Sequence, residues 1–188
     1  MVKYLHDHEL QIAYLDLKPA NILIGAGGIL KLADFGLSKP SACISGRCGT
    51  PRYMAPEDRA SKNSDLYSLG VILHEMVFGD EALELAKLKN TSVSSEILEY
   101  LTRQYDTNRV GKIYSVELKD IIEGLIKVKP SERIGSEEKG GIRSIENSPW
   151  YKLMYNKVKL IVRDNDKTRP VPRSKFWSMS RIRSLFCL

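Results

Sequence analysis

The sequence predicts a mainly helical protein with one short β-hairpin near its amino-terminal end. Two apolar segments, residues 22–24 and 29–33, flank the turn Gly25-Ala26-Gly27-Gly28, a composition typical of a hairpin. The longest apolar stretch is LYSLGVILHEMVF, residues 66–78. It is too short to span a bilayer and contains a histidine and a glutamate, so it predicts a buried helix.

The other elements follow in order from composition and period. Residues 2–16 predict the last turns of a helix, a polar turn and a short strand. Residues 34–57 are rich in Gly, Pro and Ser, and their apolar residues do not recur at a regular spacing. A loop of that length is uncommon in a compact domain and is usually functional. Further helices are expected over residues 64–78, within 81–104, over 115–127 and over 136–147, punctuated by Pro130 and Pro149.

The composition is that of a globular protein expected inside the cell. The 188 residues are 43% hydrophobic and 28% charged. The first ten residues, MVKYLHDHEL, lack the basic start and apolar core of a signal peptide. The three cysteines form no metal-like spacing, and their odd number favours a reducing compartment. We therefore expect a cytoplasmic protein.

The net charge of +6 is concentrated at the carboxyl-terminal end. Residues 163–188 hold seven Lys and Arg against two Asp, which leaves +5 in that segment. The rest is close to neutral, which argues against a nucleic-acid binder. We expect one folded unit over residues 1–155 and a basic amphipathic tail over 156–188. Such a tail can bind calmodulin or an anionic membrane surface, or remain a solvated end.

The segment YLDLKPANIL, residues 14–23, carries the residue types that phosphoryl transfer needs. That reaction requires a group to orient a hydroxyl and cations to neutralise the phosphates. Asp16 supplies a carboxylate for the hydroxyl proton, and Lys18 is an ammonium for the phosphate. Asn21 offers a neutral oxygen to Mg²⁺, which prefers oxygen ligands. Asp34, after the hairpin, can hold a second Mg²⁺ site.

Several motifs in order resemble those of the eukaryotic-type Ser/Thr protein kinases. They are D-L-K-P-x-N, D-F-G thirteen residues after the Asn, G-T-P-x-Y-x-A-P-E, SDLYSLGVILHEMVFG and YSVELKDIIEGLIKVKPSERIG. GIRSIENSPWY is similar to the stretch that closes the domain in the cyclic-nucleotide-dependent, AGC-type kinases. The match covers roughly residues 2–151. It implies the large, carboxyl-terminal lobe of a kinase, with the amino-terminal lobe absent from this chain.

The resemblance implies a role for each matching residue. Asp16 would be the catalytic base and Lys18 a phosphate-binding residue. Asn21 and Asp34 would be the Mg²⁺ ligands. Thr50 would bridge Asp16 and Lys18, as in kinases that act on Ser and Thr.

Four more residues take roles by the same resemblance. Leu23 would lie under the adenine ring of ATP. Glu57 would pair with Arg133 as a buried structural ion pair. Asp65 would accept backbone N–H groups of the catalytic loop. The implied function is ATP-dependent phosphorylation of Ser or Thr in protein substrates, with ATP and Mg²⁺ as cofactors.

The sequence departs from the family pattern in its phosphate-covering parts. It contains no G-x-G-x-x-G, and the strand Lys and helix Glu of the smaller lobe would precede this segment. Two hypotheses follow. The chain is part of a working kinase, truncated or completed by a separate amino-terminal lobe or regulatory chain. Alternatively, it is a non-catalytic, pseudokinase-like interaction module.

Single positions depart as well. Leu15 stands where the family carries the Arg that clamps a phosphate on the activation loop. Ala20 and Arg52 stand where related kinases often carry Glu, while Glu75 remains. These changes leave a preference for basic substrates open.

A second motif competes for one segment. DTNRVGKIYSVE, Asp106–Glu117, has the spacing of a calcium-binding EF-hand loop. Val110 occupies the fifth position, where an oxygen ligand is needed. The alternatives are a Ca²⁺ site and a plain connection between two helices.

Overall fold

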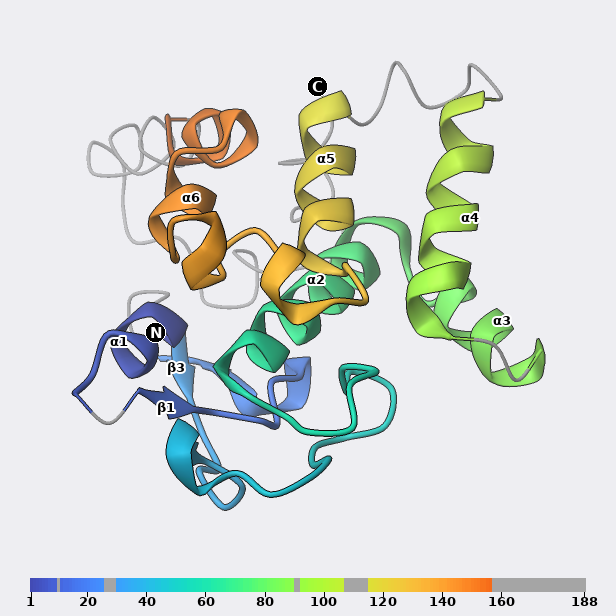
Figure 1. Cartoon of the computed structure of the whole chain (residues 1–188). Coiled ribbons are helices and arrows are strands. Elements are labelled where there is room, and N and C mark those ends of the chain that lie inside the picture. The colour runs from blue at the N-terminus through green and yellow to red at the C-terminus, as the bar shows by residue number, and fades with distance from the viewer. Residues whose placement is uncertain (10, 26–29, 90–91, 107–114, 157–188) are drawn as a thin grey trace.

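The computed structural model describes residues 1–9, 11–25, 30–89, 92–106 and 115–156, and this part of the chain is mostly helical (Figure 1). The labelled α-helices are α1 (Val2–His6), α2 (Lys62–Phe78), α3 (Glu81–Lys89), α4 (Val93–Asp106), α5 (Val116–Leu125) and α6 (Arg143–Glu146), and residues 149–156 are helical as well. Short 3-10 turns occur at η1 (Pro19–Asn21), η3 (Ser41–Cys43), η4 (Pro130–Glu132) and η5 (Glu137–Lys139). The strands are β1 (Ile12–Ala13), β2 (Ile22–Ile24), β3 (Leu30–Leu32) and β4 (Lys39–Pro40).

Helix α2 is the centre of the fold, as its apolar sequence predicts. Its first turn is closed by a reciprocal cap: the Ser61 hydroxyl accepts from Asn63 N at 3.2 Å, and the Ser64 hydroxyl accepts from Ser61 N at 2.9 Å. Gly79, with φ of 84°, ends the helix. Most faces of α2 are buried, because other helices pack around it.

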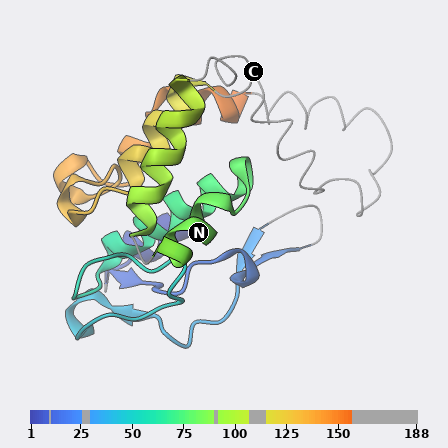
Figure 2. The ribbon, with the colours of Figure 1, turned by 90° about the vertical axis from the view of Figure 1, so that its right-hand side faces the viewer.

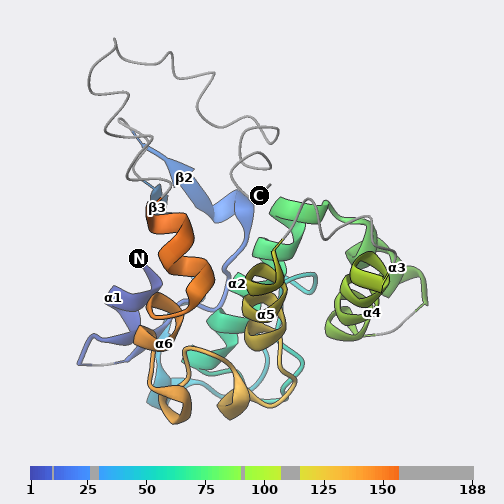
Figure 3. The ribbon, with the colours of Figure 1, turned by 90° about the horizontal axis from the view of Figure 1, so that it is seen from above.

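The helices pack as two pairs around one core. Helix α5 lies against α2, and α3 lies against α4 (Figures 1 and 3). Gly70 permits the close approach of α5, since a Cβ there would lie 2.7 Å from Ile126 Cγ2 and 2.8 Å from Leu125 Cβ. The core contains Leu66 of α2 and Ile122 of α5, and its other buried residues come from segments between Tyr14 and Ile126. This packing gives a fixed helical core, and the polar loops lie against it.

The predicted hairpin is present as an antiparallel pair of β2 and β3. Ile22 faces Leu32, and Ile24 faces Leu30. The hairpin extends from one side of the helical body (Figure 2). A second small sheet, which the sequence analysis did not predict, pairs β1 with β4. Strands of two residues are too short to produce an alternating pattern.

The prediction of one continuous helix over residues 136–147 was wrong in the length of the helix. The structure has η5, two glycines in left-handed conformation and then the four-residue α6. Gly140 and Gly141, with φ of 90° and 64°, interrupt the helix. The region expected to contain a helix within 81–104 holds two, α3 and α4.

Three sequence predictions fall on positions outside the described residues. They are most of the hairpin turn, the core of the EF-hand-like loop Asp106–Glu117, and nearly all of the basic tail 156–188. Within the described part, no helix combines the length and apolar character needed to cross a membrane.

Candidate active site

The segment before Asp16 is fixed by one buried carboxylate in the first turn of α2. Asp65 Oδ2 accepts from Tyr14 N at 2.8 Å, and Asp65 Oδ1 accepts from Leu15 N at 2.7 Å. His6 Nε2 of α1 lies 2.9 Å from the same Oδ2. Leu15 has a φ of 70°, a conformation that residues other than glycine rarely adopt. The hydrogen bonds to Asp65 hold the loop in this shape.

Leu15 also belongs to a small apolar cluster under the long loop. It is buried with Ala13, Ile44 and Ala60, and Cys48 packs against the group. The cluster joins the segment around Asp16 to the 34–57 loop. Ser41 adds a hydrogen bond from its hydroxyl to Gln11 O at 2.5 Å.

Four of the predicted site residues meet in one hydrogen-bonded group. Thr50 Oγ1 donates to Asp16 Oδ1 at 2.6 Å, and Thr50 N donates to the same oxygen at 3.1 Å. Lys18 Nζ lies 2.8 Å from Asp16 Oδ2 and donates to Thr50 Oγ1 at 2.9 Å. Asn21 Nδ2 donates to Asp16 Oδ2 at 3.0 Å. We refer to Asp16, Lys18, Asn21 and Thr50 as the Asp16 cluster.

The charge state of Asp16 follows from this setting. Burial would raise the pKa of Asp16, but hydrogen bonds from Lys18 and Thr50 outweigh it and leave the pKa below its ordinary value. The carboxylate is therefore ionised at neutral pH. An ionised carboxylate accepts hydrogen bonds, which is the property needed to orient a hydroxyl group.

Asp34 lies next to the Asp16 cluster, at the end of the hairpin. Ala33 N donates to Asn21 O at 2.9 Å, so Asp34 follows the point at which the two segments join. Asp34 is exposed, with a φ of 56°, and its Oδ1 accepts from Gly36 N at 3.1 Å. The Phe35 ring packs edge-on against Tyr14, with centroids 5.3 Å apart.

The sequence predicts Asn21 and Asp34 as magnesium ligands, and each side chain carries an oxygen atom of the kind that Mg²⁺ prefers. In the residues that the structure describes, no group of three or more His, Cys, Asp or Glu side chains could hold a metal alone. Magnesium does not need such a cage, because it commonly takes one or two carboxylates with phosphates and water. The donation from Asn21 Nδ2 to Asp16 turns the amide oxygen away from that carboxylate.

Exposed apolar side chains lie on and beside the hairpin. Leu23 is 52% exposed, Ile24 51%, and Phe35, beyond the hairpin, 50%. Leu23 is the residue that the sequence analysis placed under an adenine ring, and its side chain is open to such a contact.

The predicted pair of Glu57 and Arg133 forms a two-armed ion pair. Arg133 Nη1 donates to Glu57 Oε1 at 2.9 Å, and Nη2 donates to Oε2 at 2.6 Å. The remaining donors of Arg133 reach three backbone carbonyls, those of Lys127, Val128 and Asn63. Burial would raise the pKa of Glu57, but hydrogen bonds from Arg133 and Ser64 lower it below its ordinary value. Every N–H of Arg133 is thus satisfied.

Some contributors to the site have no sequence signal. His6 lies in a polar segment without a motif, yet it contacts Asp65. Tyr14 donates its hydroxyl to Ala33 O, which joins the loop to the end of the hairpin. Both contacts link positions brought together only by folding.

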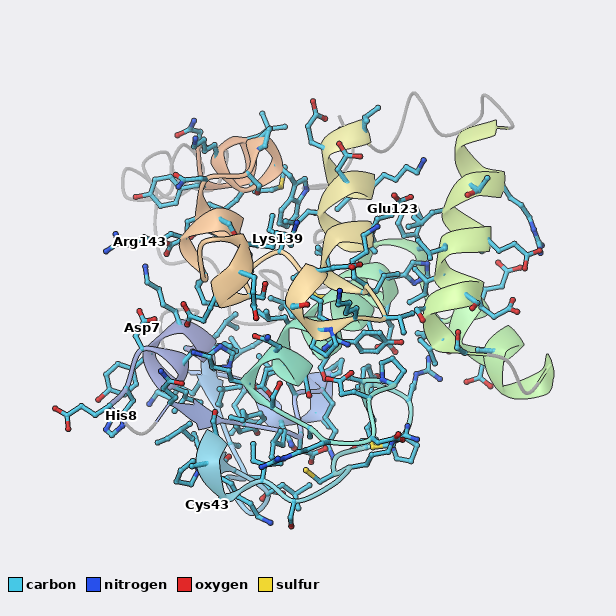
Figure 4. The ribbon with its side chains drawn as sticks, viewed as in Figure 1. Asp7, His8, Cys43, Glu123, Lys139 and Arg143 are labelled. Atoms are coloured by element: carbon cyan, nitrogen blue, oxygen red, sulfur yellow. The ribbon has the colours of Figure 1, made fainter. Side chains whose placement is uncertain are left out.

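A crevice in the described part lies away from these residues. It has a volume of about 510 Å³ and lies between the end of α1 and the 135–143 segment. Asp7 and Arg143 both line it (Figure 4). Its other charged groups include Lys3 and Lys62, which pair with glutamates. None of the predicted site residues lines this crevice.

Comparison with known proteins agrees with this geometry. The protein kinase domain family matches residues 1–151. The chain is 31% identical over 156 residues to atypical protein kinase C of Drosophila melanogaster, covering 78% of this chain and 26% of that protein. It is 34% identical over 165 residues to the serine/threonine-protein kinase gad8 of Schizosaccharomyces pombe, covering 80% and 27%.

A third relative is the cAMP-dependent protein kinase catalytic subunit 2 of Drosophila melanogaster. It is 30% identical over 152 residues, which cover 77% of this chain and 40% of the relative. Across the curated relatives compared, the chain spans between 20% and 40% of their length. The family match extends over most of the chain, and the chain therefore belongs to the protein kinase family.

Proposed function

We propose that residues 1–155 form the large lobe of a Ser/Thr protein kinase and that the Asp16 cluster serves phosphoryl transfer from ATP to protein hydroxyl groups. The observation that carries this proposal is the grouping of Asp16, Lys18, Asn21 and Thr50 within hydrogen-bonding distance. A buried carboxylate, an ammonium and an amide in one place match the needs of that chemistry.

Asp16 has the central part in the proposed mechanism. Its ionised carboxylate accepts a hydrogen bond from the Ser or Thr hydroxyl of the substrate and takes the proton as that oxygen bonds to the γ-phosphorus of ATP, while the bond from this phosphorus to ADP, the leaving group, breaks. Lys18 places a positive charge beside the same carboxylate, where the transferred phosphoryl group would pass. Thr50 keeps Asp16 and Lys18 at a fixed spacing.

Asn21 and Asp34 would hold the metal. Bound with ATP, Mg²⁺ supplies positive charge that neutralises the phosphates. The protein's contribution is position: Asn21 is fixed through Asp16, and Asp34 is fixed through the backbone contact of Ala33 with Asn21. Asp65 then holds the whole loop against the core.

The exposed apolar side chains on and beside the hairpin support a further part of the proposal. Leu23, Ile24 and Phe35 are exposed, and Leu23 and Ile24 follow Asn21 of the Asp16 cluster by two and three residues in the chain. A separate amino-terminal lobe or a regulatory chain would cover them and the nucleotide together. The same exposed side chains support the second candidate function, a non-catalytic interaction module that binds a protein partner.

The first test is a thermal melt of the purified chain with and without Mg·ATP. A ligand at 100 times its Kd stabilises the folded state by about 2.7 kcal/mol. The shift should disappear in Asp34→Asn and persist in Asp120→Asn, the same change at an exposed position of α5. No shift at millimolar Mg·ATP would favour the non-catalytic module.

Phosphate transfer is the second test. With a shift present, the chain should transfer labelled phosphate to Ser or Thr peptides, and Asp16→Asn should abolish the transfer while nucleotide binding is kept. Equal transfer by wild type and Asp16→Asn would contradict the role given to Asp16.

A further inference from the structure

The loop after Thr50 carries a charge arrangement that the proposed mechanism does not use. The guanidinium of Arg52 lies among three carboxylates. Its Nη1 donates to Glu84 Oε1 at 2.5 Å, and its Nη2 donates to Glu75 Oε1 at 3.3 Å. Nη2 also lies 3.6 Å from Asp80 Oδ2. Three negative charges surround one positive charge, so the group keeps a net negative charge.

The carboxylates come from one corner of the helical body. Glu75 belongs to α2, Glu84 belongs to α3, and Asp80 lies between the two helices. The second oxygen of Glu75 accepts from the Tyr53 hydroxyl at 2.6 Å. Burial and this hydrogen bond raise the pKa of Tyr53 to about 12, so Tyr53 remains a donor. Both oxygens of Glu75 are therefore engaged inside the protein.

Arg52 covers the inner side of this acidic group, and two of the acids face solvent. The Arg52 side chain is 28% exposed, against 67% for Asp80 and 47% for Glu84. Its Nε is buried and, within the described residues, has no hydrogen-bond partner. Arg133 differs, since its five N–H groups are all satisfied. Arg52 is therefore held mainly by attraction to the surrounding carboxylates, and its hydrogen-bond donors are less completely paired than those of Arg133.

The acidic group lies close to the Asp16 cluster. Arg52 is two residues after Thr50, a path of at most ~7 Å along the chain, and Thr50 contacts Asp16 directly. Under the proposed function, a peptide with its hydroxyl at Asp16 would place a neighbouring residue near this acidic group. An acidic group at such a place selects a positive side chain in the peptide, unless the protein supplies the positive charge itself.

We infer that Arg52 is a specificity-determining residue that supplies this cation internally and so excludes peptides with Arg or Lys at the facing position. This inference rests on the proposed function, because it concerns the peptide that the site accepts. A peptide guanidinium would have to displace Arg52 from Glu75 and Glu84 or lie beside its like charge. Peptides with a neutral residue at that position meet no such obstacle.

The test compares peptide binding by the full chain and its Arg52→Ala variant. The probes are labelled Ser peptides that differ only in one flanking residue, Arg or Ala, with the Arg moved through the flanking positions. The Kd of each peptide is measured by fluorescence anisotropy. Wild type should bind the Arg and Ala peptides equally or prefer Ala. Arg52→Ala should bind the Arg peptide about tenfold more tightly at one position, as expected for a charge-assisted contact.

Matched variants separate this role from a structural one. Adding Glu84→Gln to Arg52→Ala should reduce the gain, because it removes one of the exposed carboxylates. Arg143→Ala, which removes an exposed Arg on α6, should leave the Kd ratio unchanged. Arg52→Gln retains donor groups without the charge, and it provides the same test if Arg52→Ala does not fold in a thermal melt.

The inference is overturned if wild type already prefers an Arg peptide tenfold, or if removing the Arg52 charge produces no preference at any position. Absence of peptide binding by both proteins also overturns it. The Mg·ATP melt and the phosphate-transfer assay are scored separately. A failure there removes the proposed chemistry, whereas the ratio of peptide affinities reports on Arg52 alone.

Discussion

Replacing His74 by phenylalanine should remove a loss of stability that the protein suffers in mild acid. His74 lies in the buried part of α2, where its ring contacts Phe78 at 5.1 Å and Tyr100 at 5.5 Å between centroids. Neither ring nitrogen has a hydrogen-bond partner among the described residues. Burial lowers the pKa of His74 from 6.5 to about 4, because the charged ring is poorly solvated there.

The sign of the effect follows from proton uptake. Between pH 6.5 and 4 the unfolded chain binds a proton at His74 that the folded chain does not bind, so folding becomes less favourable as the pH falls. The stability is complete above pH 6.5 and is lost progressively toward pH 4. At 1.36 kcal/mol per pH unit, the loss is about 2 kcal/mol at pH 5 and roughly 3 kcal/mol below pH 4.

Urea denaturation at pH 7 and pH 5 measures this loss directly. Phenylalanine preserves the ring contacts and cannot take a proton, so His74→Phe should lose about 2 kcal/mol less than wild type between the two pH values. The exposed His8 provides a control, since His8→Gln should leave the wild-type loss in place. If wild type and His74→Phe lose the same free energy, the buried ring is not the origin of the acid sensitivity.

Two further substitutions test the packing and the ion pair. Arg133→Met leaves the carboxylate of Glu57 without its partner and should cost roughly 3–5 kcal/mol in chemical denaturation, with part of the loss recovered by a second change, Glu57→Gln. A cost below 1 kcal/mol would show that water replaces Arg133 easily. Gly70→Ala places a methyl group 2.7 Å from Ile126 and should cost about 1–3 kcal/mol. An unchanged melting temperature would mean that α5 moves away from α2 at little cost.

Sequence reasoning is strongest where local composition and local structure coincide. The hairpin was predicted from two apolar segments around a glycine-rich turn, and the paired residues of β2 and β3 confirm it. Helix α2 was predicted from a continuous apolar run with a polar start, and the capping by Ser61 and Ser64 explains the position of that start. These signals lie within a few residues of the structure that they specify.

Long-range contacts were beyond sequence reasoning of this kind. The short strand expected at the end of residues 2–16 is present as β1, but its pairing with β4 was not predicted, and nothing local distinguishes Lys39 or Pro40 as a strand residue. The contact of His6 with Asp65 spans 59 positions. The roles of Asp16, Lys18, Asn21 and Asp34 were inferred from motif order and stay predictions, although the first three share one hydrogen-bonded group.

The apolar cluster of Ala13, Leu15, Ile44 and Ala60 has a consequence for how the long loop is controlled. The strength of this contact depends on buried area and shape, so it responds to temperature and to cavity-forming substitutions. A clamp between an arginine and a phosphate is different, because adding or removing one charge makes or breaks it. With leucine at position 15, this contact between the long loop and the segment before Asp16 forms when the chain folds and contains no charge that salt could screen.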